Sequence, residues 1–74
     1  MNATKNYLHN INVGNFFQFR VYKVIDGHKQ VFYIAEPVGL GVTRLADTEE
    51  ELKKTLEKDV PKLLKWLERT RQRG

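Results

Sequence analysis

A β-hairpin signal in the middle of the chain most constrains what it can fold into. Asp26-Gly27 is a dipeptide typical of tight turns, and it separates two segments, 16–25 and 28–36, of β-strand character. A turn of this kind brings the two segments together as antiparallel neighbours. The sequence therefore predicts a hairpin over residues 16–36.

The length of the hairpin loop predicts which side chains share a face of the sheet. With a two-residue loop, one face is apolar and collects Phe17, Phe19, Val21, Phe32 and Ile34. A four-residue loop over 26–29 shifts the pairing by two residues and keeps the same side chains together. The opposite face is then mixed in character, and it holds Gln18, Arg20, Tyr22, Val31, Tyr33 and Ala35.

A second turn signal, Gly14-Asn15, precedes the hairpin and suits a type II′ turn. Residues 7–13 alternate in character ahead of it and are a candidate strand against 16–22. That pairing points Asn10 and Asn12 at the apolar face, where side-chain amides need partners. It also brings together two pairs of residues, His9 with Arg20 and Tyr7 with Tyr22.

The segment after the hairpin connects it to a last short strand. Proline removes a backbone donor and two glycines relax the chain over residues 37–41, which indicates a loop. Residues 42–45 are then expected to form the short strand.

The clearest helix signal begins at Thr48, which forms a capping box with Glu51. An apolar stripe follows at helical spacing, flanked by Leu64 and Trp66, and is expected to cover the apolar face of the sheet. The stripe consists of Leu52, Leu56, Val60, Leu63 and Leu67. Because proline disrupts a helix interior, Pro61 indicates either one kinked helix or two helices, the second capped by Asp59.

Together these elements predict an α+β fold. We expect a small antiparallel sheet of three sequential strands, or four if residues 7–13 pair, backed on one face by a C-terminal helix or kinked helix pair. The 74 residues suit one domain spanning 1–74, with 1–6 and 71–74 expected to be disordered. The sequence shows neither a signal peptide nor a stretch long enough to span a bilayer, so a cytoplasmic location is expected.

The residue inventory argues against catalysis and against a metal or other cofactor. The chain has no cysteine and no serine, and its two histidines are far apart in sequence. His28 falls in or beside the turn, where polar residues are common for local reasons. Arg20 beside His9 would discourage its protonation and metal binding. We therefore expect a binding domain rather than an enzyme, with no small-molecule substrate.

The uncovered face of the sheet is the best candidate binding site. Its tyrosines and cations are the residue types that proteins use to bind single-stranded nucleic acid, and the net charge of +4 favours anionic partners. Arg20 and Lys29 are expected to hold phosphates, and Tyr22 and Tyr33 to stack on bases. If residues 7–13 pair, the face also gains Tyr7, His9 and Ile11.

The order of hairpin, short strand and capped helix resembles the arm-site DNA-binding domains of tyrosine recombinases, which read DNA with a three-stranded sheet backed by a helix. The resemblance is one of topology. The strands here lack the dense Lys and Arg content of those domains, so no site residue is transferred.

A protein-interaction module is the alternative function. Tyr and Arg are also favoured at protein interfaces, and a homodimer would help a chain this short to gain stability. The contact would use an exposed strand edge or the flank of the helix that carries Leu64 and Trp66.

Overall fold

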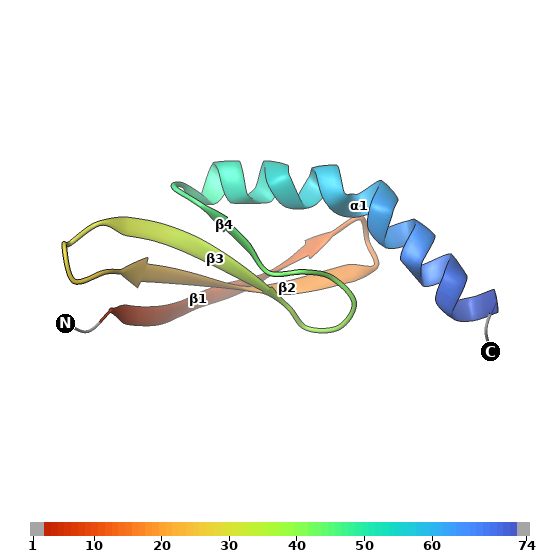
Figure 1. The fold of residues 1–74 in the computed structure, drawn as a ribbon, viewed down its shortest axis with the longest axis horizontal. Coiled ribbons are helices and arrows are strands. Elements are labelled where there is room, and N and C mark those ends of the chain that lie inside the picture. The colour runs from red at the N-terminus through yellow and green to blue at the C-terminus, as the bar shows by residue number, and fades with distance from the viewer. Residues whose placement is uncertain (1–2, 73–74) are drawn as a thin grey trace.

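Four sequential strands form one sheet, and a single helix covers one of its faces (Figure 1). The computed structural model describes residues 3–72. In chain order the elements are β1 (Thr4–Val13), β2 (Phe17–Ile25), β3 (Val31–Pro37), β4 (Arg44–Ala46) and α1 (Glu49–Gln72). Each strand pairs antiparallel with the next, in the order β1-β2-β3-β4. The expected α+β architecture is confirmed.

Residues 26–30 connect β2 to β3, and because Asp26 pairs with Gln30 the loop that closes the hairpin has three residues, 27–29, rather than two or four. Asp26 and Gln30 flank it, and the Asp26 N–H donates to the Gln30 carbonyl at 3.0 Å. The Asp26 carboxylate accepts hydrogen bonds from the N–H groups of His28 and Gln30, at 2.8 and 2.9 Å. Lys29 has a φ of 64°, the left-handed residue that follows a type I turn in this class of loop.

Because the loop has an odd number of residues, each face of the sheet receives the side chains of β3 that were predicted for the other face. Phe32 and Ile34 do not lie on the Phe17 side of the sheet, so that prediction is wrong. Tyr33 and Ala35 lie there instead, because a slip of one residue turns every side chain of a strand over. The register gives the pairs Val21–Ala35, Tyr22–Ile34 and Val24–Phe32.

The loop between β1 and β2 also contains three residues, 14–16. Gly14 and Asn15 have φ values of 62° and 64°, whereas a type II′ turn has a positive φ only at its first central residue. Val13 therefore lies opposite Phe17, and His9 lies opposite Val21 rather than opposite Arg20 as predicted.

This register turns the amides of β1 away from the core. Asn10 and Asn12 lie opposite Arg20 and Gln18, on the face away from the helix, which corrects the prediction that they point inward. The register shifts by one residue between Tyr7 and His9, which reverses the alternation of side chains along β1. Tyr7 therefore lies opposite Tyr22, as predicted.

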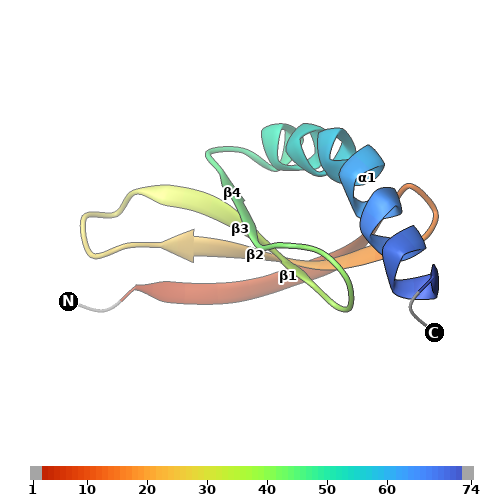
Figure 2. The ribbon, with the colours of Figure 1, turned by 45° about the vertical axis from the view of Figure 1, so that its right-hand side comes forward.

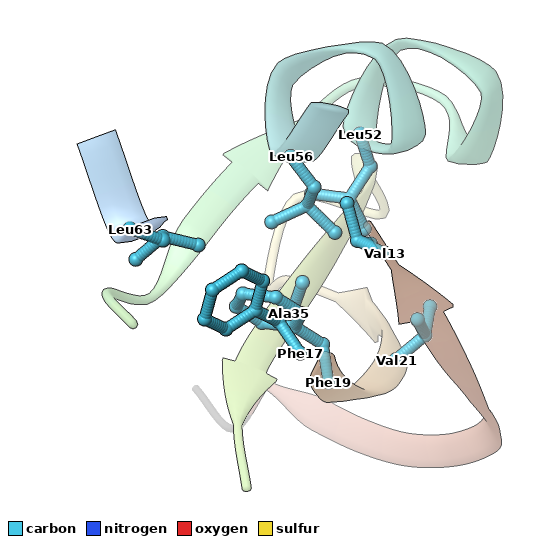
Figure 3. Packing of buried hydrophobic residues seen from close by; sticks show 8 residues of the cluster. All are labelled: Val13, Phe17, Phe19, Val21, Ala35, Leu52, Leu56 and Leu63. Atoms are coloured by element: carbon cyan, nitrogen blue, oxygen red, sulfur yellow. The ribbon is translucent and has the colours of Figure 1, made fainter. Parts of the chain in front are cut away.

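The hydrophobic core lies between the sheet and α1 (Figure 3). Eight side chains form it, and each exposes 5% or less of its surface: Val13, Phe17, Phe19, Val21, Ala35, Leu52, Leu56 and Leu63. Val60 and Trp66 pack against this cluster from α1. The helix approaches the first loop so closely that a Cβ on Gly14 would lie 2.9 Å from Val60 Cγ1.

One kinked helix, not two, follows the sheet. The Glu51 N–H donates to Thr48 Oγ1 at 3.1 Å, as a capping box requires. The helix continues through Pro61 and changes direction along its length (Figures 1 and 2). Asp59 does not cap a second helix. Its carboxylate accepts two hydrogen bonds from the Arg44 guanidinium, at 2.7 and 3.2 Å, and ties α1 to β4.

The remaining boundaries differ slightly from expectation. The last strand is Arg44–Ala46 instead of 42–45, and Leu45 points away from α1. Of the ranges 1–6 and 71–74, residues 4–6 belong to β1 and 71–72 to α1; residues 1–2 and 73–74 lie outside the described residues. Within residues 3–72, no helix combines the length and apolar character needed to cross a bilayer.

Candidate nucleic-acid interface

The face of the sheet opposite α1 is uncovered by any other described element (Figure 2). Alternation along each strand assigns its residues, and we call this surface the open face. β1 contributes Lys5, Tyr7, Asn10 and Asn12; β2 contributes Gln18, Arg20, Tyr22 and Val24; β3 and β4 contribute Phe32, Ile34, Glu36 and Leu45.

Two tyrosines from neighbouring strands form the aromatic part of the open face. The rings of Tyr7 and Tyr22 meet edge to face with their centroids 5.7 Å apart. The Tyr7 hydroxyl donates to the Asn10 side chain at 2.7 Å, which restricts the ring. Tyr7 is 55% exposed, whereas Tyr22 is half-buried. Tyr7 is therefore the ring that a ligand on this face can reach most easily.

The charged groups of the open face are adjacent to one another. Lys5 Nζ lies 2.5 Å from Glu36 Oε2 and 4.3 Å from the centroid of the Tyr22 ring. The hydrogen bond to Glu36 raises the pKa of Lys5 above its ordinary value. Arg20 lies directly opposite Glu36 in the register. Glu36 is thus ion-paired with Lys5 and has Arg20 as its cross-strand neighbour, and with two cations and one carboxylate the described residues of the face carry a small positive charge.

The structure brings together only two of the four residues predicted to bind nucleic acid. Arg20 and Tyr22 lie on the open face as neighbours along β2. Tyr33 lies on the helix side, opposite Ala46, and packs against the core. Lys29 lies in the loop at the far end of the hairpin, beyond the start of α1 (Figure 1).

Sequence reasoning assigned some residues of β1 to the wrong face. Tyr7 joins the open face as expected, but His9 and Ile11 lie on the helix side, and three polar residues that were not predicted to lie on this face do so instead. These are Lys5, Asn10 and Asn12. A sequence signal for them existed, because Gly and Asn at 14 and 15 both tolerate the positive φ that a three-residue loop uses here.

His9 lies between the edge of the sheet and the first turn of α1. Its Nε2 is 2.9 Å from Glu49 Oε1, and this hydrogen bond, with a second to the Asn10 carbonyl, raises the pKa of His9. The expectation that Arg20 would discourage protonation is wrong, because the register places the two residues on opposite faces. Within the described part of the chain, no three potential metal ligands cluster.

A second exposed surface lies where the first loop, the β3–β4 connection and the second half of α1 meet. Phe16 lies at the centre of this surface and is 72% exposed. The hollows on either side of Phe16 are lined mainly by apolar residues, with Gln18 in one and Glu68 in the other. We call this surface the end patch; it consists of Phe16, Val38, Leu40, Leu64 and Leu67. Trp66 packs against the core and is not part of it.

Neither family models, curated proteins nor solved structures gave a match when the chain was compared with them.

Proposed function

We propose that this chain binds single-stranded nucleic acid on the open face. The observation that carries the proposal is the exposed ring of Tyr7, held edge-on against Tyr22 and bordered by Arg20 and side-chain amides. Aromatic rings that stack on bases beside cations that meet phosphates are the elements of a single-strand platform. Tyr33 has no stacking role in this proposal, because it packs against the core on the covered side of the sheet.

Each group on the open face has a separate task in this proposal. Tyr7 stacks on a base, and Arg20 contacts the phosphate next to that base in the strand. The amides of Asn10, Asn12 and Gln18 have both donors and acceptors, so they can form hydrogen bonds with unpaired base edges. These three amides are exposed and lie along the same stretch of β1 and β2.

The charge of the open face favours a single strand over a duplex. Duplex binding depends on neutralising many phosphates, and among residues 3–72 this face supplies only two cations, Lys5 and Arg20, next to Glu36. Base stacking needs few cations, but it needs bases that are not already stacked within a double helix. Affinity for the duplex form of the same oligonucleotide should therefore be lower.

Fluorescence polarisation of labelled single-stranded and duplex oligonucleotides at low and moderate salt tests the proposal. We expect salt-sensitive binding of the single strand, weakened about tenfold or more by Tyr7→Leu, which removes the stacking ring. Arg20→Gln should weaken binding and reduce its salt dependence.

The matched control for Arg20→Gln is Lys54→Gln, which removes the same charge from an exposed position on α1. It should leave binding close to that of the unmodified protein. Absence of binding at low salt, or full binding by the Tyr7→Leu protein, would contradict the proposed function.

Self-association through the end patch is a second candidate function, favoured by the exposure of Phe16. Lys65 and Glu68 are exposed beside Leu64 and Leu67 on α1, and such opposite charges at the edge of a self-complementary patch can attract a second copy of the chain. A stable dimer usually needs about 800 Å² from each partner, and five partly exposed side chains supply less, so the association should be weak.

Light scattering over a range of protein concentrations tests this second candidate. We expect the mean mass to rise with concentration, and Phe16→Asp to abolish the rise. Leu45→Asp, at a residue 61% exposed on the open face, is the matched control and should leave it unchanged. A monomer at every concentration, or equal effects of the two substitutions, would exclude the end patch as a self-association site.

A further inference from the structure

The Lys5 side chain crosses from the edge strand to the third strand of the sheet. Lys5 belongs to β1 and Glu36 to β3, so the ion pair between them spans the intervening strand β2. On its way the ammonium group lies over the ring of Tyr22, 4.3 Å from the centroid. One face of that ring is therefore occupied by Lys5, and Tyr7 meets the ring at close range as well.

We infer that Glu36 controls how strongly the open face binds nucleic acid, because it holds Lys5 over Tyr22 and lies opposite Arg20, so its negative charge is close to both cations that would otherwise meet phosphate. This inference rests on the proposed function. Its consequence is a division of roles between the tyrosines. Tyr7 stacks on the base, and Tyr22 supports Tyr7 and Lys5 without itself being free to stack.

The position of Glu36 distinguishes it from the other acidic residues of the described chain. Among the described residues of the open face it is the only acidic side chain, and both cations adjoin it. Lys5 is bonded to it, and Arg20 is its cross-strand partner. A carboxylate close to two cations lowers the positive potential that a phosphate meets.

The ion pair is weak enough to exchange partners. The side chains of Lys5 and Glu36 are 46% and 36% exposed, and ion pairs in such settings contribute little to stability. A phosphate that reaches Lys5 therefore replaces one accessible anionic partner with another. The Lys5 ammonium can then move from the Tyr22 ring towards the nucleic-acid backbone without disrupting the fold.

Glu36→Gln is the direct test, with a fluorescein-labelled oligothymidylate as the probe. The substitution removes the negative charge and keeps the shape of the side chain. We expect affinity at low salt to rise about threefold to tenfold. The slope of log affinity against log salt should steepen by about 0.7, the value for one additional phosphate contact with a single strand.

Two further proteins separate this mechanism from general electrostatics. Glu57→Gln makes the same change in net charge at an exposed position on α1, and it should raise affinity less than twofold. In a Lys5→Gln background, the gain from Glu36→Gln should shrink, because the cation that Glu36 restrains is absent. Circular dichroism of each protein verifies that the fold is retained.

The outcomes distinguish this inference from the function on which it rests. If neither the unmodified protein nor the Glu36→Gln protein binds, the proposed function fails and this inference fails with it. If both bind with equal affinity and equal salt dependence, the proposed function stands and the control by Glu36 is refuted. An equal gain from Glu57→Gln would likewise refute it.

Discussion

The two faces of the sheet use their side chains in different ways. On the covered face, strand residues such as Phe19 and Ala35 expose 1% or less of their surface and meet three fully buried leucines of α1. On the open face Val24 is buried at 5% exposure, but the other residues interact as pairs, for example Tyr7 with Tyr22 and Lys5 with Glu36, and remain partly exposed. Stability should therefore depend on the covered face, and the open face is free to serve binding.

The largest expected difference between the two faces concerns a pair of leucines. Leu56 is fully buried, so Leu56→Ala should lower the free energy of unfolding by about 2–5 kcal/mol through lost contacts and a cavity. Leu45 is 61% exposed on the open face, and Leu45→Ala should change it by about 0.5 kcal/mol or less. Urea denaturation measures both. Equal losses would mean that the open face also carries the fold.

A glycine next to the core gives the second comparison. Gly41 has a φ of 144°, and a Cβ there would lie 3.0 Å from Pro37 Cβ and 3.1 Å from Phe19 Cζ. Gly41→Ala should therefore cost about 1–3 kcal/mol of unfolding free energy, from backbone strain and displacement of the Phe19 ring. Gly39 has open space around it, so Gly39→Ala is the control and should be close to neutral in the same urea titration.

Two ion pairs extend the comparison to charged groups. Arg44 holds Asp59, whose side chain is only 16% exposed, between the sheet and α1. Arg44→Met should leave this carboxylate without its partner and cost about 1–3 kcal/mol, measured as a lower Tm and a lower urea midpoint. Lys5→Met breaks the exposed pair on the open face and should leave Tm unchanged within error. The reverse order would contradict the assignment of stability to the covered face.

The smallest expected effect is a pH dependence at the edge of the covered face. Glu49 raises the pKa of His9, so protonated His9 stabilises the fold below its unfolded pKa, and this contribution is lost as pH rises through the higher folded pKa. Glu50 and Lys53 also line the depression beside His9. Because the pair is exposed, the change should be about 0.5 kcal/mol or less.

His9→Gln checks this effect. Denaturation midpoints measured from mildly acidic to mildly basic pH should fall less steeply in the His9→Gln protein than in the unmodified protein. Identical pH profiles would show that the His9–Glu49 contact does not contribute in solution.

The sequence was most informative where one local pattern determines the result. Thr48 and Glu51 located the start of α1, and the leucine stripe identified the side of the helix that meets the sheet. Asp26-Gly27 located the β2–β3 hairpin correctly. These signals depend on neighbouring residues alone, so they do not require knowledge of the tertiary fold.

The assignment of faces failed because it depends on a single residue in each loop. The left-handed conformation of Lys29 is unusual for a residue with a side chain, and nothing in the sequence marks it. With three residues in each loop, Tyr33 turned to the core and Asn10 turned to the open face. Half of the predicted site moved for this reason, although the strands were predicted in the order in which they pair.

The most direct test of the account is an NMR titration of the isotopically labelled protein with a single-stranded oligonucleotide. The side-chain amides of Asn10, Asn12 and Gln18 report on the open face, and the indole N–H of Trp66 reports on the helix side. We predict that the three amide signals shift in proportion to bound ligand while the indole signal stays in place. Unchanged amide signals, or shifts centred on Trp66, would contradict the assignment of binding to the open face.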